Sequence, residues 1–570
     1  MNALDWLVLL GAVVGIAAYG TWRTRHTDKL DTYLKGGSAT KWGTIGLSVM
    51  ATQASTITYL SLPGQAYENG IAFIQNYFGL PLALIVVCAV FLPIYRKLGV
   101  YTAYEYLGQR FDQKTRLLGA GLFLLQRGLQ AGITIYAPSI ILATVLGWRL
   151  DLTIIFTGLV AIVYTVTGGS AAVNLTQKLQ MGVIFGGMIT AFIVLLVKLP
   201  PDAAHIAGAM GKLEAVSYTP DLKQRYTIWT GILGGFFLSL SYFGTDQSQV
   251  QRYLGGARLR EGRLGLMFNA LFKIPMQFFI VLLGALLFVF YQFQANTPVV
   301  FNQTQWQRQV AGPDGAKFKA IEEKHAAAHA DKQEKIRAWV AAHEAGNTAA
   351  ETTARTALAA AQKTSDAVRN EARAALQAAD PSAKRTKDSD YVFVTFILTQ
   401  LPHGVIGLLL AVMFASALSS KAGELNALGT TTTIDLWRSF RPLAVRDEPR
   451  NVRNAKWFTA FWGIFAIGFA LFAGFQEDLI ESLNIVASVF YPPLAGVFLV
   501  AFFCKHVGGS AVFWAALATQ LLLLGLFYFA KGSLAYLWLN PIGCVACVVF
   551  AVVLQAIGVG RVYGPPSEQS

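Results

Sequence analysis

The stretch LSVMATQASTITYLSLPGQAYENG, residues 47–70, decides the fold, because an apolar run here carries polar residues at its centre. Hydroxyl and amide side chains gather at 52–58, and Pro63 and Gly64, residue types that interrupt helices, follow them. A second apolar run breaks in the same way at SYFGTDQSQVQR, residues 241–252. Backbone unwinds at membrane depth only where it lines a cavity or is buried in protein. The two stretches therefore predict a polar cavity inside a helical membrane protein.

The composition of the whole chain fits a protein that crosses a membrane many times. Hydrophobic residues make up 54% of the 570 residues, and the mean hydropathy is +0.47. Charged residues make up 14%, whereas soluble domains carry about 25%. These values exclude a cytosolic enzyme, a secreted disulfide scaffold, a small anchored protein and an outer-membrane barrel, whose strands would alternate.

Thirteen apolar runs approach the roughly 20 residues that cross a bilayer as a helix. The predicted spans are about 4–22, 43–66, 71–95, 116–147, 151–167, 171–198, 227–251, 264–293, 391–436, 456–476, 479–504, 509–531 and 534–559. The run at 391–436 is long enough to extend past the bilayer or to bend.

The two broken spans lie about 190 residues apart, and each opens a series of five predicted spans. Transporters built from an inverted repeat have this arrangement, with their binding site near the midplane of the bilayer. The predicted fold class is therefore an all-α polytopic membrane protein of about 13 transmembrane helices. Its core is predicted to be a five-plus-five inverted repeat of the LeuT-like kind.

Basic residues mark the loops that are predicted to face the cytoplasm. Arg23, Arg25 and Lys29 follow the first span, and further basic residues gather at 96–116 and 438–456. Because lysine and arginine are enriched in cytoplasmic loops, this predicts a plasma-membrane protein (bacterial inner membrane) with its N-terminus outside and its C-terminus in the cytoplasm. These loops explain the net charge of +14, so the expected partners are a small-molecule solute and the lipid bilayer, and not nucleic acid.

A charged insertion, residues 294–390, separates the membrane spans of 1–293 from those of 391–570. Residues 301–390 hold 26 of the 78 charged residues and are rich in good helix formers. They predict two or three solvated helices on the outer side. The insertion is either a tolerated surface segment or an arm that binds a protein partner, whose identity the sequence does not give.

A third polar stretch is ASALSSKAGELNALGTTTTIDLW, residues 415–437. Ser416 and Ser420 share one helix face, with Ser419 beside them. Sodium accepts a shell of oxygen dipoles, which two hydroxyls and the carbonyls of an unwound helix could supply. Alternatively, these hydroxyls are small packing groups that bond back to their own helix.

Together, these stretches and three further motifs resemble the sodium:solute symporter family, which includes sodium cotransporters of glucose, proline, sialic acid and iodide. The resemblance covers about residues 4–560 outside the insertion and implies a ten-helix inverted repeat with flanking helices. Its marks are YTAYEYLGQRF (101–111), YTVTGG (164–169), GTDQSQVQR (244–252), ALSSKAGELN (417–426), TIDLW (433–437) and the YPP–GVF stretch (491–498).

The resemblance also implies a sodium site of five oxygens. The carbonyls come from the first broken span and the long span, and the hydroxyls from the serine pair: Ala51, Ala54, Ser416, Ser419 and Ser420.

Some family members bind a second sodium through an aspartate and two hydroxyls, and at those positions this chain has Gln177, Ala422 and Gly423. None of these replacements is anionic. We therefore predict one coupling sodium ion and no other cofactor.

The resemblance does not indicate a sugar as the solute. Sugar-transporting members have an acid and a glutamine where this chain has Ile57 and Thr58, and a glutamate where it has Tyr77. Asp246, Gln247 and Lys273 still match those members in kind, and Asn484 stands where they have a glutamine. The candidate solute-binding residues are Gln53, Thr56, Asn76, Tyr77, Asp246, Gln247, Lys273 and Asn484.

Charged residues inside the spans each need a partner or a function. Lys273 lies near the middle of its span and either contacts a carboxylate on the solute or pairs with Asp246, and pairing is the prediction. Lys421 and Glu424, three residues apart on one helix, are expected to pair with each other.

The predicted function is sodium-coupled import of a small polar solute by alternating access. The spans hold no histidine cluster and no nucleophile–base pair, so an enzyme is not expected. The alternatives are a proton-coupled carrier of the same fold and a membrane sensor that binds a solute without moving it.

Overall fold

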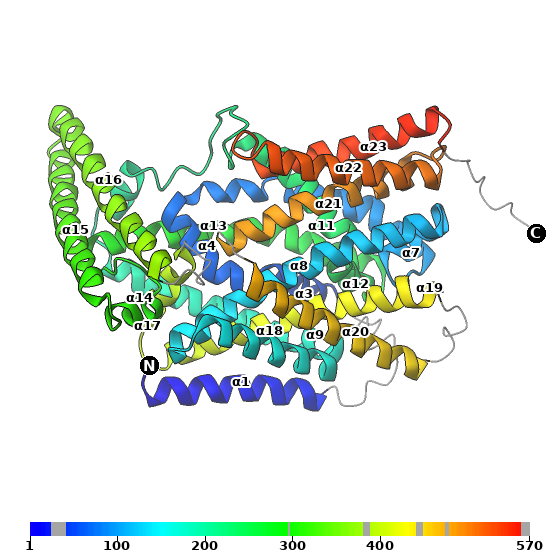
Figure 1. Ribbon diagram of the computed structural model, residues 1–570, viewed down its shortest axis with the longest axis horizontal. Coiled ribbons are helices and arrows are strands. Elements are labelled where there is room, and N and C mark those ends of the chain that lie inside the picture. The colour runs from blue at the N-terminus through cyan, green and yellow to red at the C-terminus, as the bar shows by residue number, and fades with distance from the viewer. Residues whose placement is uncertain (24–40, 295–296, 380–387, 441–447, 474–477, 560–570) are drawn as a thin grey trace, which may run out of the picture.

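A computed structural model describes residues 1–23, 41–294, 297–379, 388–440, 448–473 and 478–559. The predicted basic residues Arg25 and Lys29 lie outside these described residues, as does the tail from 560 onward. Within the described ranges every regular element is a helix, which confirms the predicted all-α class. In Figure 1, α1 lies along one edge of the bundle, α22 and α23 lie along the opposite edge, and α15 and α16 form a lobe at one end.

The first half of the chain contains both interrupted helices. Its elements are α1 (Ala3–Arg23), α3 (Trp42–Gln53), α4 (Thr56–Asn69), η1 (Ile71–Tyr77), α5 (Leu80–Val86), η2 (Val87–Phe91), α6 (Leu92–Leu98), α7 (Ala103–Arg110), α8 (Gln113–Leu146), α9 (Leu150–Lys198), α10 (Ala203–Ala209), η3 (Thr230–Gly234), α11 (Gly235–Thr245), α12 (Gln247–Leu254) and α13 (Leu259–Phe293).

The second half contains the insertion and the remaining membrane helices. Its elements are α14 (Gln303–Val310), α15 (Gly315–Glu344), α16 (Thr348–Ala379), η4 (Ser389–Tyr391), α17 (Val392–Gln400), α18 (Val405–Thr431), η5 (Thr432–Trp437), α19 (Arg438–Phe440), α20 (Glu448–Phe472), α21 (Leu479–Phe503), α22 (Gly509–Phe529), η7 (Tyr536–Trp538) and α23 (Leu539–Ala556).

Nine helices among the described residues are long and apolar enough to cross a membrane. Two further apolar helices are shorter, Ala3–Ala12 and Leu150–Val166. The interrupted pairs α3/α4 and α11/α12 are absent from both sets because each half is short and polar at the break. The number of thirteen spans and the inverted repeat both stay predictions.

Three of the predicted spans differ in their limits from the helices. The sequence predicts separate spans at 151–167 and 171–198, whereas α9 runs through both as one helix, and its side chains at 167–176 lie outside the described residues. The long predicted span at 391–436 divides between α17 and α18. Pro402 lacks an amide hydrogen, and Gly404 has a φ of 86°, a value that favours glycine.

Large apolar side chains are exposed on several of the membrane helices. They include Leu82, Leu159, Ile193, Leu271, Ile464 and Leu521. Exposed apolar side chains on helices of this hydropathy suit contact with lipid.

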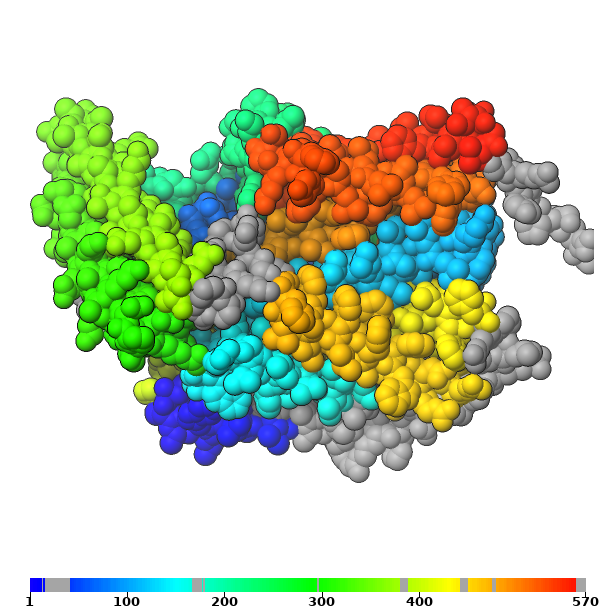
Figure 2. Space-filling view, in the orientation of Figure 1, coloured from blue at the N-terminus to red at the C-terminus, as the bar shows by residue number. Residues whose placement is uncertain are grey.

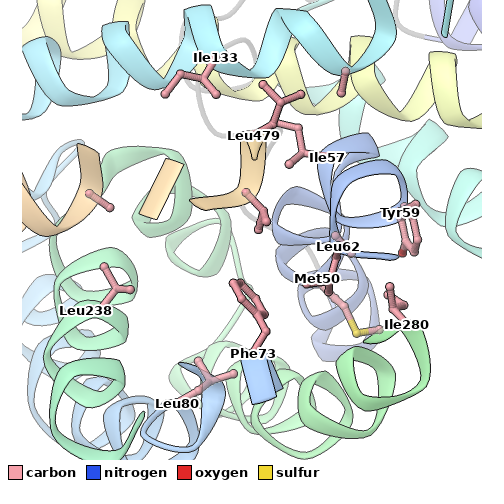
Figure 3. Packing of buried hydrophobic residues seen from close by; sticks show 14 of the residues in the cluster. Met50, Ile57, Tyr59, Leu62, Phe73, Leu80, Ile133, Leu238, Ile280 and Leu479 are labelled. Carbon is pink, nitrogen blue, oxygen red and sulfur yellow. The ribbon is translucent and has the colours of Figure 1, made fainter. Parts of the chain in front are cut away.

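The interior is one apolar cluster that extends through the membrane helices. Met50 and Leu62, from α3 and α4, lie near Ile280 of α13, while Ile57 of α4 lies beside Leu479 and Leu80 beside Phe73 (Figure 3). Apolar packing thus holds both halves of the first interrupted helix while their break faces the polar cavity.

The insertion forms three helices, α14, α15 and α16, which stand as a lobe against the end of the bundle (Figure 2). One side of the lobe is attached to the C-terminal end of α4. Arg369 Nη1 donates to the Tyr67 hydroxyl at 3.1 Å, and Arg373 Nη2 bonds to Glu68 at 3.0 Å and to Asp388 at 2.8 Å. Burial raises the pKa of Asp388, but both arginines outweigh it and hold that pKa below its ordinary value.

Candidate functional site

The first interrupted helix breaks at Ala54 and Ser55, between α3 and α4. The amide of Thr58 donates to the Ser55 carbonyl at 2.8 Å. The Ala54 carbonyl therefore lacks the bond that Thr58 would give it in a continuous helix. Carbonyls at such a break can accept another partner, which is what a cation site requires.

The second interrupted helix breaks at Asp246, between α11 and α12. The Asp246 carboxylate accepts from the amide of Ser248 at 2.8 Å and so caps the start of α12. Gln247, the next residue, bonds to the backbone of Tyr101 at 2.8 Å and of Ala103 at 3.2 Å. These contacts fix the break against α7 and the residues just before it.

The serine pair of α18 faces the first break. Ser420 Oγ lies 3.4 Å from the Ala51 carbonyl, and Ser419 Oγ lies 3.2 Å from the Ser416 carbonyl. In calcium sites the metal–oxygen distance is about 2.4 Å. Two oxygens that bind one such ion roughly at right angles to each other therefore lie about 3.4 Å apart. Each of these two separations is compatible with a pair of ligands of one small cation, and the shared sodium site stays a prediction.

Gln180 of α9 orients one of these hydroxyls. Ser419 Oγ donates to Gln180 Oε1 at 2.7 Å. A hydroxyl has one hydrogen and two lone pairs, so this bond directs the hydrogen away and leaves lone pairs for a cation. Sequence reasoning missed Gln180, because nothing in its local sequence connects α9 to the serine pair.

A cavity of about 140 Å³ lies next to the first break. Five of the eight predicted solute-binding residues line it: Gln53, Asn76, Tyr77, Lys273 and Asn484. They come from α3, η1, α13 and α21, so the fold brings together residues from 53 to 484.

The other three predicted residues do not line this cavity. Thr56 Oγ1 donates to the Met413 carbonyl of α18. Asp246 and Gln247 are fully buried at the second break, where their side chains hold neighbouring helices. In this structure these residues shape the surroundings of the cavity.

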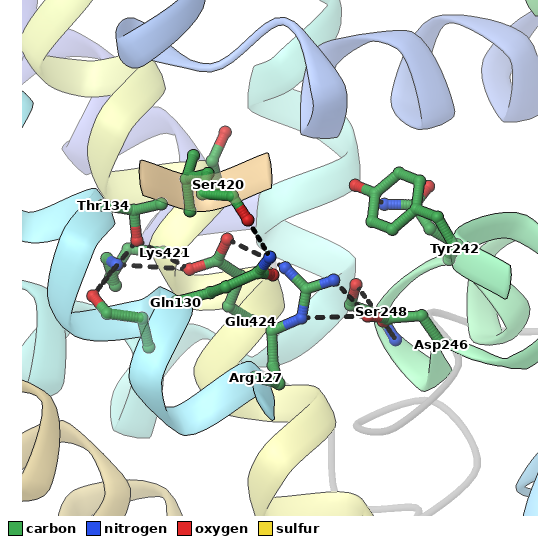
Figure 4. Close-up of polar contacts among 12 residues, drawn as sticks. Arg127, Gln130, Thr134, Tyr242, Asp246, Ser248, Ser420, Lys421 and Glu424 are labelled. Atoms are coloured by element: carbon green, nitrogen blue, oxygen red, sulfur yellow. Dashed lines mark hydrogen bonds and ion pairs between the residues drawn. The ribbon is translucent and has the colours of Figure 1, made fainter. Parts of the chain in front are cut away.

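A charged network centred on Arg127 of α8 reaches the wall of the cavity through Arg127 and Glu424 (Figure 4). Arg127 Nε bonds to Asp246 at 3.0 Å, and Arg127 Nη2 bonds to the Tyr491 hydroxyl at 2.7 Å. Arg127 Nη1 lies 3.5 Å from Glu424 of α18. The network thus joins α8, the second break, α18 and α21.

The predicted pair of Lys421 and Glu424 is present, with Lys421 Nζ 3.2 Å from Glu424 Oε2. Glu424 also accepts from the Thr134 hydroxyl at 2.9 Å. The predicted pairing of Lys273 with Asp246 is wrong, because Arg127 is the partner of Asp246. Arg127 was missed, although its place inside an apolar span is a signal of function by itself.

Two interrupted helices around a buried polar cavity define the class as a secondary transporter, not an enzyme. The model of the sodium:solute symporter family matches residues 33–311 and 371–519. The chain therefore belongs to the sodium:solute symporter family.

Relatives of this chain transport several solutes according to their names. The human sodium/iodide cotransporter is 31% identical over 50% of this chain and 43% of its own length. The human sodium-coupled monocarboxylate transporter 1 is 34% identical over 46% of this chain and 44% of its own length. These alignments span less than half of each human relative. The sodium/sialic acid symporter SiaT of Proteus mirabilis is 23% identical over 89% of this chain and 86% of its own length.

The fold is also that of a solved transporter. The outward-open, substrate-bound structure of a Na⁺-coupled sialic acid symporter superposes with a TM-score of 0.72, covering 98% of both chains at 21% identity. That likeness supports the LeuT-like architecture predicted from the two broken spans.

Proposed function

We propose that the chain imports a small polar solute together with sodium across the plasma membrane, by alternating access. The observation that carries this proposal is the 3.4 Å approach of Ser420 Oγ in α18 to the Ala51 carbonyl at the end of α3. A sodium ion bound by Ala51, Ala54, Ser416, Ser419 and Ser420 would join the first interrupted helix to the long helix.

Sodium then acts as a removable connection between two parts of the transporter. Bound from outside, it favours the conformation in which α3 and α18 are in contact. Its loss to the cytoplasm removes that contact and shifts the population toward the other conformation. The proposed orientation has the N-terminus and the insertion outside and the C-terminus in the cytoplasm, as in a bacterial inner membrane.

The proposed solute site is the cavity beside the first break. Gln53, Asn76, Tyr77, Lys273 and Asn484 would contact the solute directly. Thr56, Asp246 and Gln247 would act by holding α4 and α12 in place around it. The relatives named above carry iodide, monocarboxylates and sialic acid, so their names do not choose one solute for this chain.

Uptake into proteoliposomes tests the coupling ion. We expect an inward sodium gradient to drive solute uptake and a proton gradient without sodium to leave it at the level of empty liposomes. A lithium gradient is the control, because it tests whether another small monovalent cation can replace sodium. Uptake that follows the proton gradient in the absence of sodium would overturn the proposal.

We expect one sodium per solute. Where other members bind a second sodium, the Gln177 side-chain oxygen here accepts from Arg252 Nη1 at 3.1 Å and from the Ser48 hydroxyl at 2.9 Å. The Arg252 guanidinium also fills the space that a side chain at Gly423 would need. A sodium ion 4 Å from this fixed charge would be disfavoured by about 4 kcal/mol at an effective dielectric near 20.

Reversal-potential measurements on proteoliposomes measure this ratio directly. The voltage at which net flux stops, recorded at several sodium gradients, gives the number of sodium ions moved with each solute. A ratio of two would contradict the prediction and require a second site elsewhere in the chain.

A further inference from the structure

A second cavity, of about 320 Å³, lies on the other side of α21 from the candidate solute cavity. The two cavities use opposite faces of this helix: the second is lined by Ser482, Ile485 and Val486, and the first by Leu483, Asn484 and Ala487. A ligand in the second cavity would therefore pack against the back of a helix that lines the candidate solute site.

Much of the wall of the second cavity is apolar and belongs to a helix that suits contact with lipid. Leu526 and Phe527 come from the last turns of α22, and Leu534 comes from the turn that follows it. On the same helix Leu521 is 70% exposed and Phe529 is 85% exposed. An apolar chain could therefore reach the cavity from the hydrocarbon layer.

Three basic side chains line the second cavity, and among the described residues no acidic side chain does so: Lys223, Arg225 and Lys531. Arg225 Nη1 is paired with Glu481 Oε2 at 2.7 Å. The Asp221 carboxylate is also near, since it accepts from the backbone amide of Lys223 at 2.9 Å. Three cations against these two acids leave a positive charge in excess around the cavity.

The two lysines come from separate segments that the fold joins. The amide of Ala535, four residues after Lys531, donates to the carbonyl of Leu222, the residue before Lys223, at 2.8 Å. This backbone bond holds the segment before η3 against the turn between α22 and η7. The positively charged rim is therefore built before any ligand arrives.

Aromatic side chains place the second cavity at the depth of the lipid headgroups. Tyr218 is 70% exposed, Trp229 is 49% exposed and Tyr528, beside Phe527, is 75% exposed. Tyrosine and tryptophan are enriched where the bilayer meets water. Under the proposed orientation this end of α22 is outside, where basic residues are scarce, so topology alone does not account for three of them here.

From this arrangement we infer that the second cavity binds one anionic phospholipid, with its phosphate at Lys223 and Lys531 and an acyl chain along Leu526, Phe527 and Leu534. Clustered lysines attract anionic headgroups electrostatically, and the apolar wall adds burial of the chain. A free phosphate would share the charge but leave that wall without a ligand. The inference concerns a site separate from those of solute and sodium, and it does not rest on the proposed function.

Native mass spectrometry of the purified full-length protein in detergent tests the inference. Dioleoylphosphatidylglycerol is compared with dioleoylphosphatidylcholine, which has the same chains without net charge, and with glycerol phosphate, which has the charge without the chains. We expect one phosphatidylglycerol to be retained at a concentration where neither of the other two is. Retention of phosphatidylcholine to the same extent, or of glycerol phosphate, would overturn the assignment of an anionic lipid.

The double variant Lys223→Gln with Lys531→Gln links the binding to this cavity. A lysine near the surface strengthens the binding of an anionic lipid by about fivefold, so we expect the loss of both to weaken phosphatidylglycerol binding by about twentyfold. The matched control is Lys317→Gln with Lys319→Gln, which removes the same charge from exposed positions of α15 in the insertion. The control should bind the lipid as the wild type does.

A third variant, Ala530→Trp, tests the apolar part of the second cavity. Ala530 lines the cavity at the end of α22, so an indole here would occupy the space of the acyl chain while all three basic residues remain. We expect weaker phosphatidylglycerol binding than in the wild type, with unfolding of the lipid-free variant as the check that it is folded. Wild-type binding in the double lysine variant, or in a folded Ala530→Trp protein, would overturn the site.

Discussion

Replacing Arg127 with Met is expected to destabilise the protein by about 3–5 kcal/mol and to abolish solute uptake. Removing one partner of a buried ion pair leaves the other charge uncompensated, and costs of this size are typical. Here Asp246 would lose two hydrogen bonds from the guanidinium, and the Tyr491 hydroxyl would lose one. Because these groups lie at the second break and on α21, the variant would be less stable, and these elements would no longer be held in place around the cavity.

Unfolding of the purified protein in detergent, followed by heat or by denaturant, measures the loss. Arg149→Met is the matched control, since the Arg149 side chain is 65% exposed and, among the described residues, pairs with nearby Asp151 at 2.9 Å. A surface pair contributes about 0–1 kcal/mol. The double variant Arg127→Met with Asp246→Asn should recover much of the stability, because neither change then leaves an unpaired charge. An Arg127→Met protein as stable as the wild type would contradict the assigned network.

The sequence was sufficient to predict the all-α membrane class and the places where two of the spans break. An apolar run of about 20 residues indicates a helix that lies in the bilayer. Hydroxyl and amide residues inside such a run indicate a break in that helix. This is why the first break was expected within 47–70 and lies at Ala54 and Ser55. The single helix α9 was not predicted, because two adjacent apolar runs look the same whether or not a turn separates them.

The charged network could not be derived from the sequence in the same way. Arg127 lies 119 residues from Asp246 and 297 residues from Glu424 along the chain. Local patterns carry no information about pairing over such separations, so Lys273 was an equally plausible partner for Asp246. The pair of Lys421 and Glu424 was predictable, because a spacing of three residues on one helix fixes their proximity.

The contacts that the insertion makes with the membrane helices could not be derived from its sequence either. Its composition predicted helices, and three helices are present. Its composition also suggested a fully solvated segment, yet Phe301 packs edge-on against Tyr67 with ring centres 5.4 Å apart. The sequence around an arginine that contacts α4 looks the same as the sequence around an arginine that faces water. Only the folded structure distinguishes the two.

Replacing Ser419 with Ala is expected to abolish or strongly weaken sodium-driven uptake. The variant removes one of the five proposed sodium oxygens, and the methyl group that replaces it cannot bind a cation. Losing one bond to a charged group costs about 1.5–3 kcal/mol, which is roughly a tenfold to hundredfold loss in sodium affinity. Gln180 would also lose the hydrogen that its Oε1 accepts at 2.7 Å. The sodium concentration that gives half-maximal uptake should therefore rise by that factor.

Ser139→Ala separates this effect from the general cost of losing a buried hydroxyl. Ser139 lies on α8, is fully buried, and bonds to the Ile135 carbonyl of its own helix at 2.7 Å. Its removal should therefore leave the sodium midpoint unchanged while lowering stability slightly. If Ser419→Ala keeps the sodium dependence of the wild type, the serine pair packs against its own helix, and the cation must bind elsewhere. A shift in Ser419→Ala without a shift in Ser139→Ala would place the coupling ion between α3 and α18, where its release can separate the two helices.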